Sequence, residues 1–162
     1  MSQADPAIRP ARKSDVDAID AVEGSSFDAD RFSRNALKRL LAAMTAECRV
    51  AEVDGKVVGY VCVLFRAGAG VARIYSIAVD PAYRGRGVAQ RLIAAAEQTA
   101  RVRGARSLRL EVRASNMAAL GLYERAGFTF LERKPGYYQN GEDALRLEKH
   151  LEPREAGGRS AL

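Results

Sequence analysis

The segment IYSIAVDPAYRGRGVAQRLI, residues 74–93, carries the strongest structural signal in this chain. A run rich in apolar and β-branched residues ends at Asp80-Pro81, and apolar residues at helical spacing begin at Val88, which predicts a strand followed closely by a helix. The loop between them, RGRG at residues 84–87, is both glycine-rich and positively charged. The first N–H groups of a helix lack intrahelical partners and lie at the positive end of its dipole, so this loop suits an anion such as a phosphate.

This loop does not match two common phosphate-binding signatures. It lacks G-x-x-x-x-G-K-[ST], which disfavours a P-loop NTPase, and it lacks G-x-G-x-x-G with an acidic residue about 20 positions on. Six arginines and one glutamate lie between Arg84 and Arg106, a balance of +5 within a formal net charge of +6. Such a surface suits a small polyphosphate or a nucleic acid, and a solvated helix face without a ligand is the third possibility.

Composition predicts one soluble globular domain. The 162 residues are 48% hydrophobic and 28% charged, and no apolar run approaches the ~20 residues of a membrane span. The N-terminal residues lack the apolar stretch of a secretory signal, so we expect a cytoplasmic protein. Two cysteines, Cys48 and Cys62, lie in strand-like runs and are expected to be buried, reduced thiols. With one histidine in the chain, we expect no zinc or other metal site.

The patterning along the chain predicts an α+β, or mixed α/β, fold: about six or seven strands in a sheet flanked by about four helices. Strands are expected at residues 7–11, 48–53, 56–65, 71–79, 107–113, 128–133 and 142–151, and helices at 13–22, 35–44, 88–104 and 116–125. Residues 24–33, GSSFDADRFS, are expected to form a loop. We expect a single domain over residues 1–151 and a disordered tail over residues 152–162.

Two motifs in this order resemble the GNAT superfamily of N-acetyltransferases. Arg84-x-x-Gly87-x-Ala89, after IAVDPAY, is similar to its coenzyme A pyrophosphate loop, and LEVRASNMAALGLYERAGF, residues 110–128, is similar to its second signature. With the later GYY and EDA, the second motif more closely resembles the bacterial ribosomal-protein-alanine N-acetyltransferases. The resemblance covers roughly residues 8–151 and is densest over residues 75–147.

The resemblance implies a GNAT fold with a mostly antiparallel, twisted central sheet. It also implies acetyl-CoA as the acetyl donor and an amine as the acceptor, and the closer resemblance points to the N-terminal amine of a protein. We expect neither a membrane nor a nucleic acid as partner. We expect the protein to be a monomer or a weak dimer. The residues that it places against the coenzyme are Ile77, Ala78 and Val79 by their main chain, the loop and helix start Arg84, Gly85, Arg86, Gly87, Val88, Ala89 and Gln90, and Asn116, which could equally cap a helix.

Acetyl transfer to an amine requires a base for the amine proton and an acid for the leaving thiolate. The alternation of residues 107–113 puts Glu111 on one strand face with Arg109 and Arg113, so an ordinary surface ion pair is one interpretation. The resemblance implies that Glu111 is the general base, directly or through water. It also implies that Tyr123, which by pattern alone is a core tyrosine, is the general acid; a phenol with a pKa of ~10 is protonated at neutral pH.

The acceptor side of the site is less well defined by the sequence. Tyr137 and Tyr138 either border the acceptor or pack over the sheet. Where the closest branch of the family has a Phe-Pro-Trp stretch, this chain has GSSFDADRFS. Lysine side chains and small-molecule amines are therefore alternative acceptors. A coenzyme A-binding module without turnover is an alternative of another class, which the presence of both Glu111 and Tyr123 disfavours, and an RNA-binding protein would show steep salt dependence.

Overall fold

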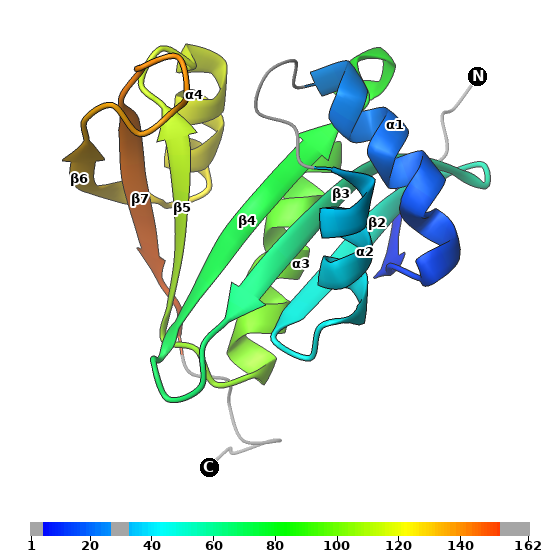
Figure 1. Cartoon of the computed structure of the whole chain (residues 1–162), viewed down its shortest axis with the longest axis horizontal. Helices are drawn as coiled ribbons and strands as arrows, with labels where there is room; N and C mark the ends of the chain where they lie inside the picture. Colours follow the sequence, from blue (N-terminus) through cyan, green and yellow to red (C-terminus); the bar gives the residue numbers. More distant parts are fainter. Residues whose placement is uncertain (1–4, 27–32, 153–162) are drawn as a thin grey trace.

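The computed structural model describes residues 5–26 and 33–152, which form a seven-stranded sheet in the order β1-β2-β3-β4-β5-β7-β6 (Figure 1). The strands are β1 (Ala7–Pro10), β2 (Ala46–Val53), β3 (Lys56–Phe65), β4 (Val71–Val79), β5 (Ser107–Arg113), β6 (Thr129–Lys134) and β7 (Ala144–His150). The helices are α1 (Val16–Ser26), α2 (Arg34–Ala42), α3 (Val88–Val102) and α4 (Met117–Arg125), with 3-10 turns at Lys13–Asp15 and Pro81–Tyr83. The predicted fold class is confirmed.

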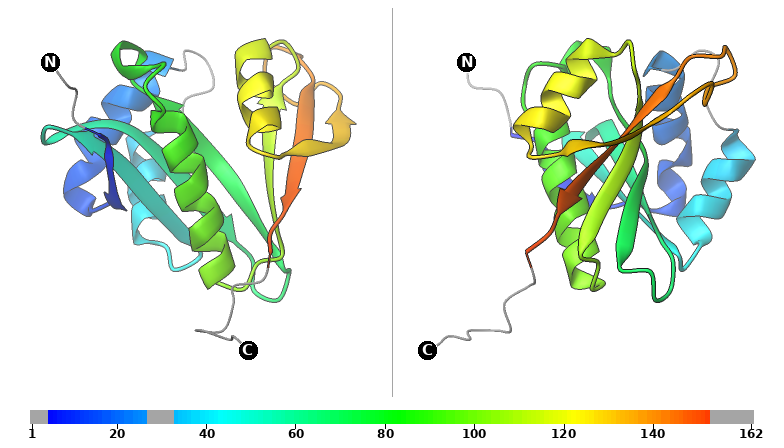
Figure 2. Two further views of the ribbon diagram at one scale, coloured as in Figure 1. Left: turned by 180° about the vertical axis from the view of Figure 1, so that it is seen from behind. Right: turned by 90° about the vertical axis from the view of Figure 1, so that its left-hand side faces the viewer.

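Helices cover both faces of the sheet. Helices α1 and α2 lie over β2, β3 and β4 on the face seen in Figure 1, and α3 and α4 lie on the opposite face, seen in the left view of Figure 2. The α3 side holds the larger apolar core, which includes Leu92, Leu108 and Tyr123, and the α1 side holds a second core, which includes Ile19 and Tyr60. Neighbouring strands are antiparallel except β4 and β5, whose parallel pairing requires the crossover that α3 provides.

Strand β4 contains one residue more than β3 can pair with. Cys62 pairs with Ser76 and Val63 pairs with Ile74, which leaves Tyr75 as a β-bulge. A bulge bends a strand and increases its twist. It also shifts the alternation of side chains. Before the bulge and after it, odd-numbered residues therefore face opposite sides of the sheet.

The sheet opens into a fork beside this bulge. Strands β4 and β5 pair at residues 71–73 and 107–109, and Figure 1 shows them diverging beyond that point. Tyr75 lies two residues past the last paired position, so the bend of β4 begins where the pairing ends. We call the two diverging strands the arms of the fork.

The structure corrects two sequence predictions near the N-terminus. Helix α1 begins after a 3-10 turn and continues to Ser26, whereas the sequence predicted a helix that ends at Val22 and a loop from Gly24. The last turns of α1 stay helical because Val22 and Glu23 are buried against the sheet. Of the predicted loop, residues 27–32 lie outside the described residues, as do residues 153–162 of the predicted tail. Ser33 caps α2, with its hydroxyl accepting from Ala36 N–H over 3.1 Å.

The prediction of two buried, reduced thiols is confirmed. Cys48 and Cys62 face each other across β2 and β3, and both are free and buried. A hydrogen bond with Cys48, together with burial, raises the pKa of the Cys62 thiol. Within residues 5–26 and 33–152, no helix combines the length and the apolar composition needed to cross a membrane.

We predict that Gly59→Ala destabilises the fold by about 1–3 kcal/mol, because β3 leaves no room for a methyl group under α3. A Cβ at Gly59 would lie 3.0 Å from Leu92 Cδ1 and 3.1 Å from the Ala78 carbonyl oxygen. Gly121→Ala in α4 is the control, since its Cβ would meet the flexible end of Arg125. Urea denaturation of the three proteins measures the difference, and equal stabilities would contradict this account of the packing.

Candidate active site

The loop before α3, which we call the cradle, has a backbone that suits an anion. Gly87 adopts a left-handed conformation (φ 80°) at the N-cap of α3 and supplies no side-chain cap, so the first-turn N–H groups of Val88, Ala89 and Gln90 remain for a ligand. At Gly85 and Gly87, no described atom beyond the glycine itself and its chain neighbours lies within 4 Å of the position a Cβ would take. The open backbone and the uncapped helix start are what a phosphate requires.

Basic side chains surround this cradle. Arg84 and Arg86 are exposed, and the Arg86 guanidinium lies 4.9 Å from the centre of the Tyr83 ring. Lys56 Nζ lies 5.4 Å from the same ring. Tyr83 therefore holds two cations beside the loop through its π face.

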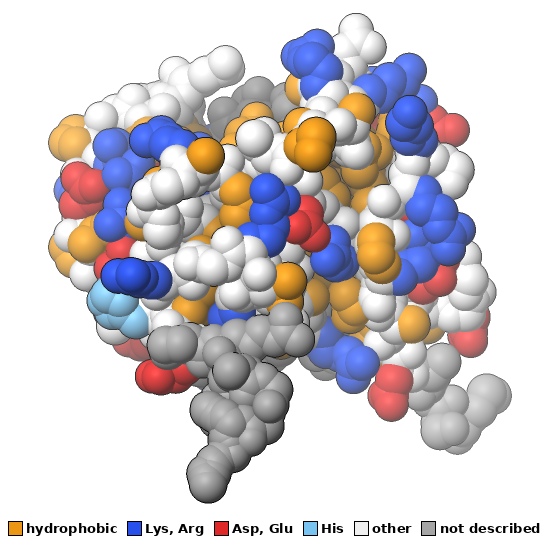
Figure 3. Space-filling view, turned by 90° about the horizontal axis from the view of Figure 1, so that it is seen from below, with side chains coloured by type: hydrophobic (Ala, Val, Ile, Leu, Met, Phe, Trp, Pro, Cys, Tyr) orange, Lys and Arg blue, Asp and Glu red, His pale blue; other side chains and the backbone are white. Residues whose placement is uncertain are grey.

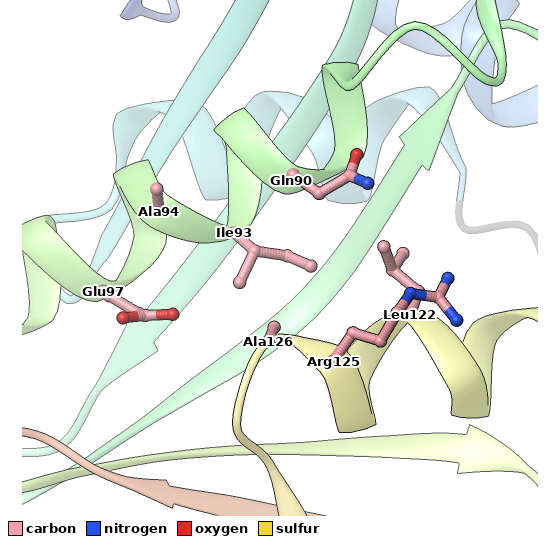
Figure 4. Close-up of a pocket in the computed structure, with 7 residues that line it drawn as sticks. All are labelled: Gln90, Ile93, Ala94, Glu97, Leu122, Arg125 and Ala126. Atoms are coloured by element: carbon pink, nitrogen blue, oxygen red, sulfur yellow. The ribbon is translucent and has the colours of Figure 1, made fainter.

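A groove leads from the cradle between α3 and α4 (Figure 4). The cavity has a volume of about 230 Å³ and is lined by Gln90, Ile93, Ala94, Glu97, Leu122, Arg125 and Ala126. Lys149 fixes the separation of the two helices at one end of the groove, because its Nζ donates to both Glu97 carboxylate oxygens over 3.0 and 3.1 Å and to the Ala126 carbonyl over 2.7 Å. An elongated ligand bound at Gln90 can extend along this groove.

The β4 arm presents main-chain groups to the fork. Asp80 N–H donates to the Val58 carbonyl of β3 over 2.8 Å, so the antiparallel alternation makes Ala78 the next β4 residue bonded to β3. Ile77 and Val79 therefore direct their N–H and C=O groups toward the fork. The main chain of Ala78, in contrast, is turned to β3.

On the β5 arm, Glu111 is held by two arginines from other strands. Arg73 Nε of β4 donates to Glu111 Oε1, and Arg146 Nε of β7 donates to Oε2, both over 2.7 Å. The Glu111 side chain is 4% exposed, and its hydrogen bond raises the pKa of Arg146 further. A carboxylate has about four acceptor positions, so each oxygen can still accept one more hydrogen bond.

These partners differ from those that the strand pattern suggested. Arg109 and Arg113 share the face of Glu111 but bind Glu148 over 2.7 Å and Glu142 over 3.0 Å. Side chains two positions apart on one strand lie farther apart than cross-strand neighbours, which decide the pairing. The partners of Glu111 depend on strand order, which the sequence pattern does not contain.

Tyr137 and Tyr138 lie beside the Glu111 cluster. Arg73 Nη2 donates to the Tyr137 hydroxyl over 2.9 Å, so one guanidinium joins Glu111 to this tyrosine. The Arg113 guanidinium lies 4.0 Å from the centre of the Tyr138 ring, and the two tyrosine rings meet edge to face with centroids 5.1 Å apart. Both tyrosines thus border the site from the loop between β6 and β7.

Tyr123 lies on the opposite side of the sheet from Glu111. It belongs to the core under α3 and α4 with Phe128, whose ring centroid is 5.8 Å away, and it is 7% exposed. Burial, with a smaller contribution from Tyr138, raises the pKa of Tyr123 to about 12. Asn116 Oδ1 caps the same helix by accepting from Ala119 N–H over 3.1 Å. A reacting group in the fork would have a carboxylate on one face and a neutral phenol on the other.

An uncapped helix start, a forked sheet, and a carboxylate and a phenol on its two faces suit an acyl-transfer site of the coenzyme A type. This chain belongs to the Acetyltransferase (GNAT) family, whose profile matches residues 17–128. It is an acetyl-CoA-dependent N-acetyltransferase, as the N-acetyltransferase names among its relatives support. The resemblance predicted from the two sequence motifs is confirmed.

Three relatives show how far the similarity extends. A Bacillus subtilis protein provisionally named a [ribosomal protein bS18]-alanine N-acetyltransferase is 36% identical over 140 residues, 86% of this chain and 91% of its own length. An N-alpha-acetyltransferase of Sulfurisphaera tokodaii is 34% identical, over 89% of this chain and 92% of its own. The crystal structure of the Escherichia coli ribosomal-protein-S18-alanine N-acetyltransferase superposes with a TM-score of 0.82 at 26% identity, covering 98% of this chain and 100% of that one.

We predict that Gly87→Val weakens acetyl-CoA binding at least 10-fold, because a side chain would fill the open cradle. Gly55→Val is a matched control: Gly55 in the β2–β3 turn also has φ 80° and also has no described atom within 4 Å of a Cβ position. Both substitutions carry the same backbone strain, but only one lies at the loop. Calorimetric titration with acetyl-CoA measures the difference, and equal affinities of the two variants would remove the loop from coenzyme binding.

Proposed function

We propose that this enzyme acetylates the N-terminal α-amine of a protein, as the ribosomal-protein-alanine type does. The observation that carries the proposal is the placement of Glu111 and Tyr123 on opposite faces of the fork, within an N-acetyltransferase fold. The names of the bacterial and archaeal relatives support a protein N-terminus as acceptor. The acceptor approaches from the face of Glu111, Tyr137 and Tyr138.

The residues of the coenzyme site divide by chemistry. The cradle at residues 84–90 binds the pyrophosphate through helix N–H groups and arginines, and the main chain of Ile77 and Val79 bonds the pantetheine amides in the fork. The groove between α3 and α4 receives the rest of the coenzyme. Asn116, whose oxygen caps α4, keeps its side-chain N–H groups for the coenzyme.

Glu111 and Tyr123 perform the two proton transfers. Glu111 accepts the proton of the attacking amine, directly or through a water held at its remaining acceptor positions. Tyr123 stays protonated at neutral pH and donates to the departing thiolate. An α-amine, with a pKa of ~7.7–8.0, loses its proton far more readily than lysine at ~10.4, so one carboxylate held by two arginines suffices for it.

A nucleic-acid partner has less support from the surface. On the face shown in Figure 3, basic side chains are interspersed with acidic and apolar ones. Most arginines of the Glu111 cluster are committed to carboxylates within 3.0 Å, which leaves less positive charge for a phosphate backbone.

We predict that Glu111→Gln lowers kcat on an alanine-ended peptide by roughly 10²-fold at pH 7 and leaves acetyl-CoA affinity unchanged. Glu132→Gln is the matched control, because Glu132 also binds Arg146, over 2.9 Å, but is 48% exposed. The acceptor is identified by incubating the enzyme with peptides that have a free N-terminus and with peptides that have a free lysine, and by measuring their acetylation by mass spectrometry. Turnover of the lysine peptides alone would refute the N-terminal proposal, and full activity of Glu111→Gln would refute the role of Glu111.

We predict that Tyr123→Phe lowers kcat by roughly 10²-fold with little change in melting temperature, because the ring packing is kept. A phenol with a pKa of about 12 keeps its proton throughout the range from pH 7 to 10. The wild-type rate should therefore show no loss of an acid in that range, whereas a tyrosine with the ordinary pKa of ~10 would be half-ionised at its upper end. A pH–rate series checks both points, and a decline that begins near pH 8 would exclude Tyr123 as the acid.

A further inference from the structure

A chain of three polar side chains runs through the apolar core under α1. Glu23 of α1 is 2% exposed and Tyr60 of β3 is fully buried. The Tyr60 hydroxyl donates to Glu23 Oε1 and lies 2.7 Å from the Ser76 hydroxyl oxygen of β4. Burial of a carboxylate and a phenol among apolar residues is costly, and a phenylalanine would fill the same space without that cost. The mechanism described so far does not use these groups.

The hydrogen bonds of this chain have a fixed direction. The one hydroxyl hydrogen of Tyr60 is directed to Glu23, whose carboxylate oxygen accepts it. Burial and the neighbouring Glu23 raise the pKa of Tyr60, so it keeps that hydrogen. Ser76 must then donate its own hydrogen to the Tyr60 oxygen. The Ser76 oxygen retains lone pairs that accept from the next donor, and the hydrogen bond that Ser76 donates strengthens this acceptor.

The chain ends on the β4 arm of the fork. Ser76 directly follows the Tyr75 bulge, three residues beyond Arg73, the last β4 residue paired with β5. Its side chain is partly exposed. Its contact with Tyr60, which belongs to the α1-side core, places it on that face of the sheet, and Glu111 projects from the same face of the β5 arm. Two side chains that accept hydrogen bonds, Ser76 on the β4 arm and Glu111 on the β5 arm, therefore flank the fork on the face from which the amine approaches.

We propose, building on the N-acetyltransferase function proposed above, that the acceptor amine donates two hydrogen bonds. One N–H donates to Ser76 Oγ and the other donates to the Glu111 carboxylate. A neutral primary amine has two N–H bonds and one lone pair. When both N–H groups are held, the lone pair points at the thioester carbonyl. Holding the amine in this orientation lowers the barrier to attack. Ser76 is then a catalytic residue, and Tyr60 and Glu23 are positioning residues that act through it.

The test is a double-mutant cycle on kcat with an alanine-ended peptide. We expect Ser76→Ala to lower kcat roughly 10- to 100-fold. The nitrogen becomes positively charged as the amine attacks, which strengthens the hydrogen bond that its N–H donates to Ser76. Acetyl-CoA affinity and melting temperature should stay close to wild type. Tyr60→Phe should lower kcat to a similar extent, and the double variant should be no slower than Ser76→Ala, since both substitutions break one chain. Ser76→Thr, which keeps the hydroxyl, should retain most of the rate.

Three results would overturn the proposal: normal kcat in Ser76→Ala, losses that multiply in the double variant, or a Ser76→Thr variant as slow as Ser76→Ala. If Tyr60→Phe does not fold, the comparison of Ser76→Ala with Ser76→Thr decides alone. Wild-type turnover and calorimetric binding of acetyl-CoA are measured first. A wild-type enzyme that binds acetyl-CoA but leaves every N-terminal peptide unmodified would refute the proposed function, whereas the three results above would refute the role of Ser76 only.

Discussion

The bulge at Tyr75 is the constraint on which the site depends. One unpaired residue bends β4 away from β5 after three paired positions, and the sheet opens without losing its core. The opening leaves the main chain of Ile77 and Val79 without a partner strand in an otherwise paired sheet. Unsatisfied main-chain groups inside a protein are costly, so an amide-bearing ligand stabilises an edge that the fold alone leaves open.

Ion pairing across strands organises the acceptor side of the fork. Glu111 is almost fully buried, and a buried carboxylate requires partners, which Arg73 and Arg146 supply from the two neighbouring strands. Arg73 lies at the last paired position of β4 and reaches both Glu111 and Tyr137. One side chain therefore holds the β5 arm and the loop between β6 and β7 in fixed positions relative to β4.

Most strands and helices could be predicted from residue periodicity, and the tight loop before α3 could be located because its glycines and arginines are adjacent in sequence. What could not be predicted depends on contacts between distant segments. The pattern VARIYSIAV reads as an unbroken strand, and only its register against β3 reveals the bulge at Tyr75. The partners of Glu111 and the bond between Tyr60 and Ser76 likewise follow from strand order. Helix α1 passes Gly24 because burial of its last turns outweighs the weak helix propensity of glycine.

The uneven distribution of charge has a kinetic consequence. Of the six arginines between Arg84 and Arg106, three (Arg84, Arg86 and Arg91) lie at or near the N-terminal end of α3, where they attract polyphosphates before any contact forms. Such attraction extends over a Debye length of about 8 Å at physiological ionic strength. A coenzyme that binds at this loop would therefore associate more slowly at high salt, whereas Glu111 and Tyr123 are buried and are screened much less. On the proposed mechanism, ionic strength acts on how fast the enzyme is loaded and much less on the chemical step.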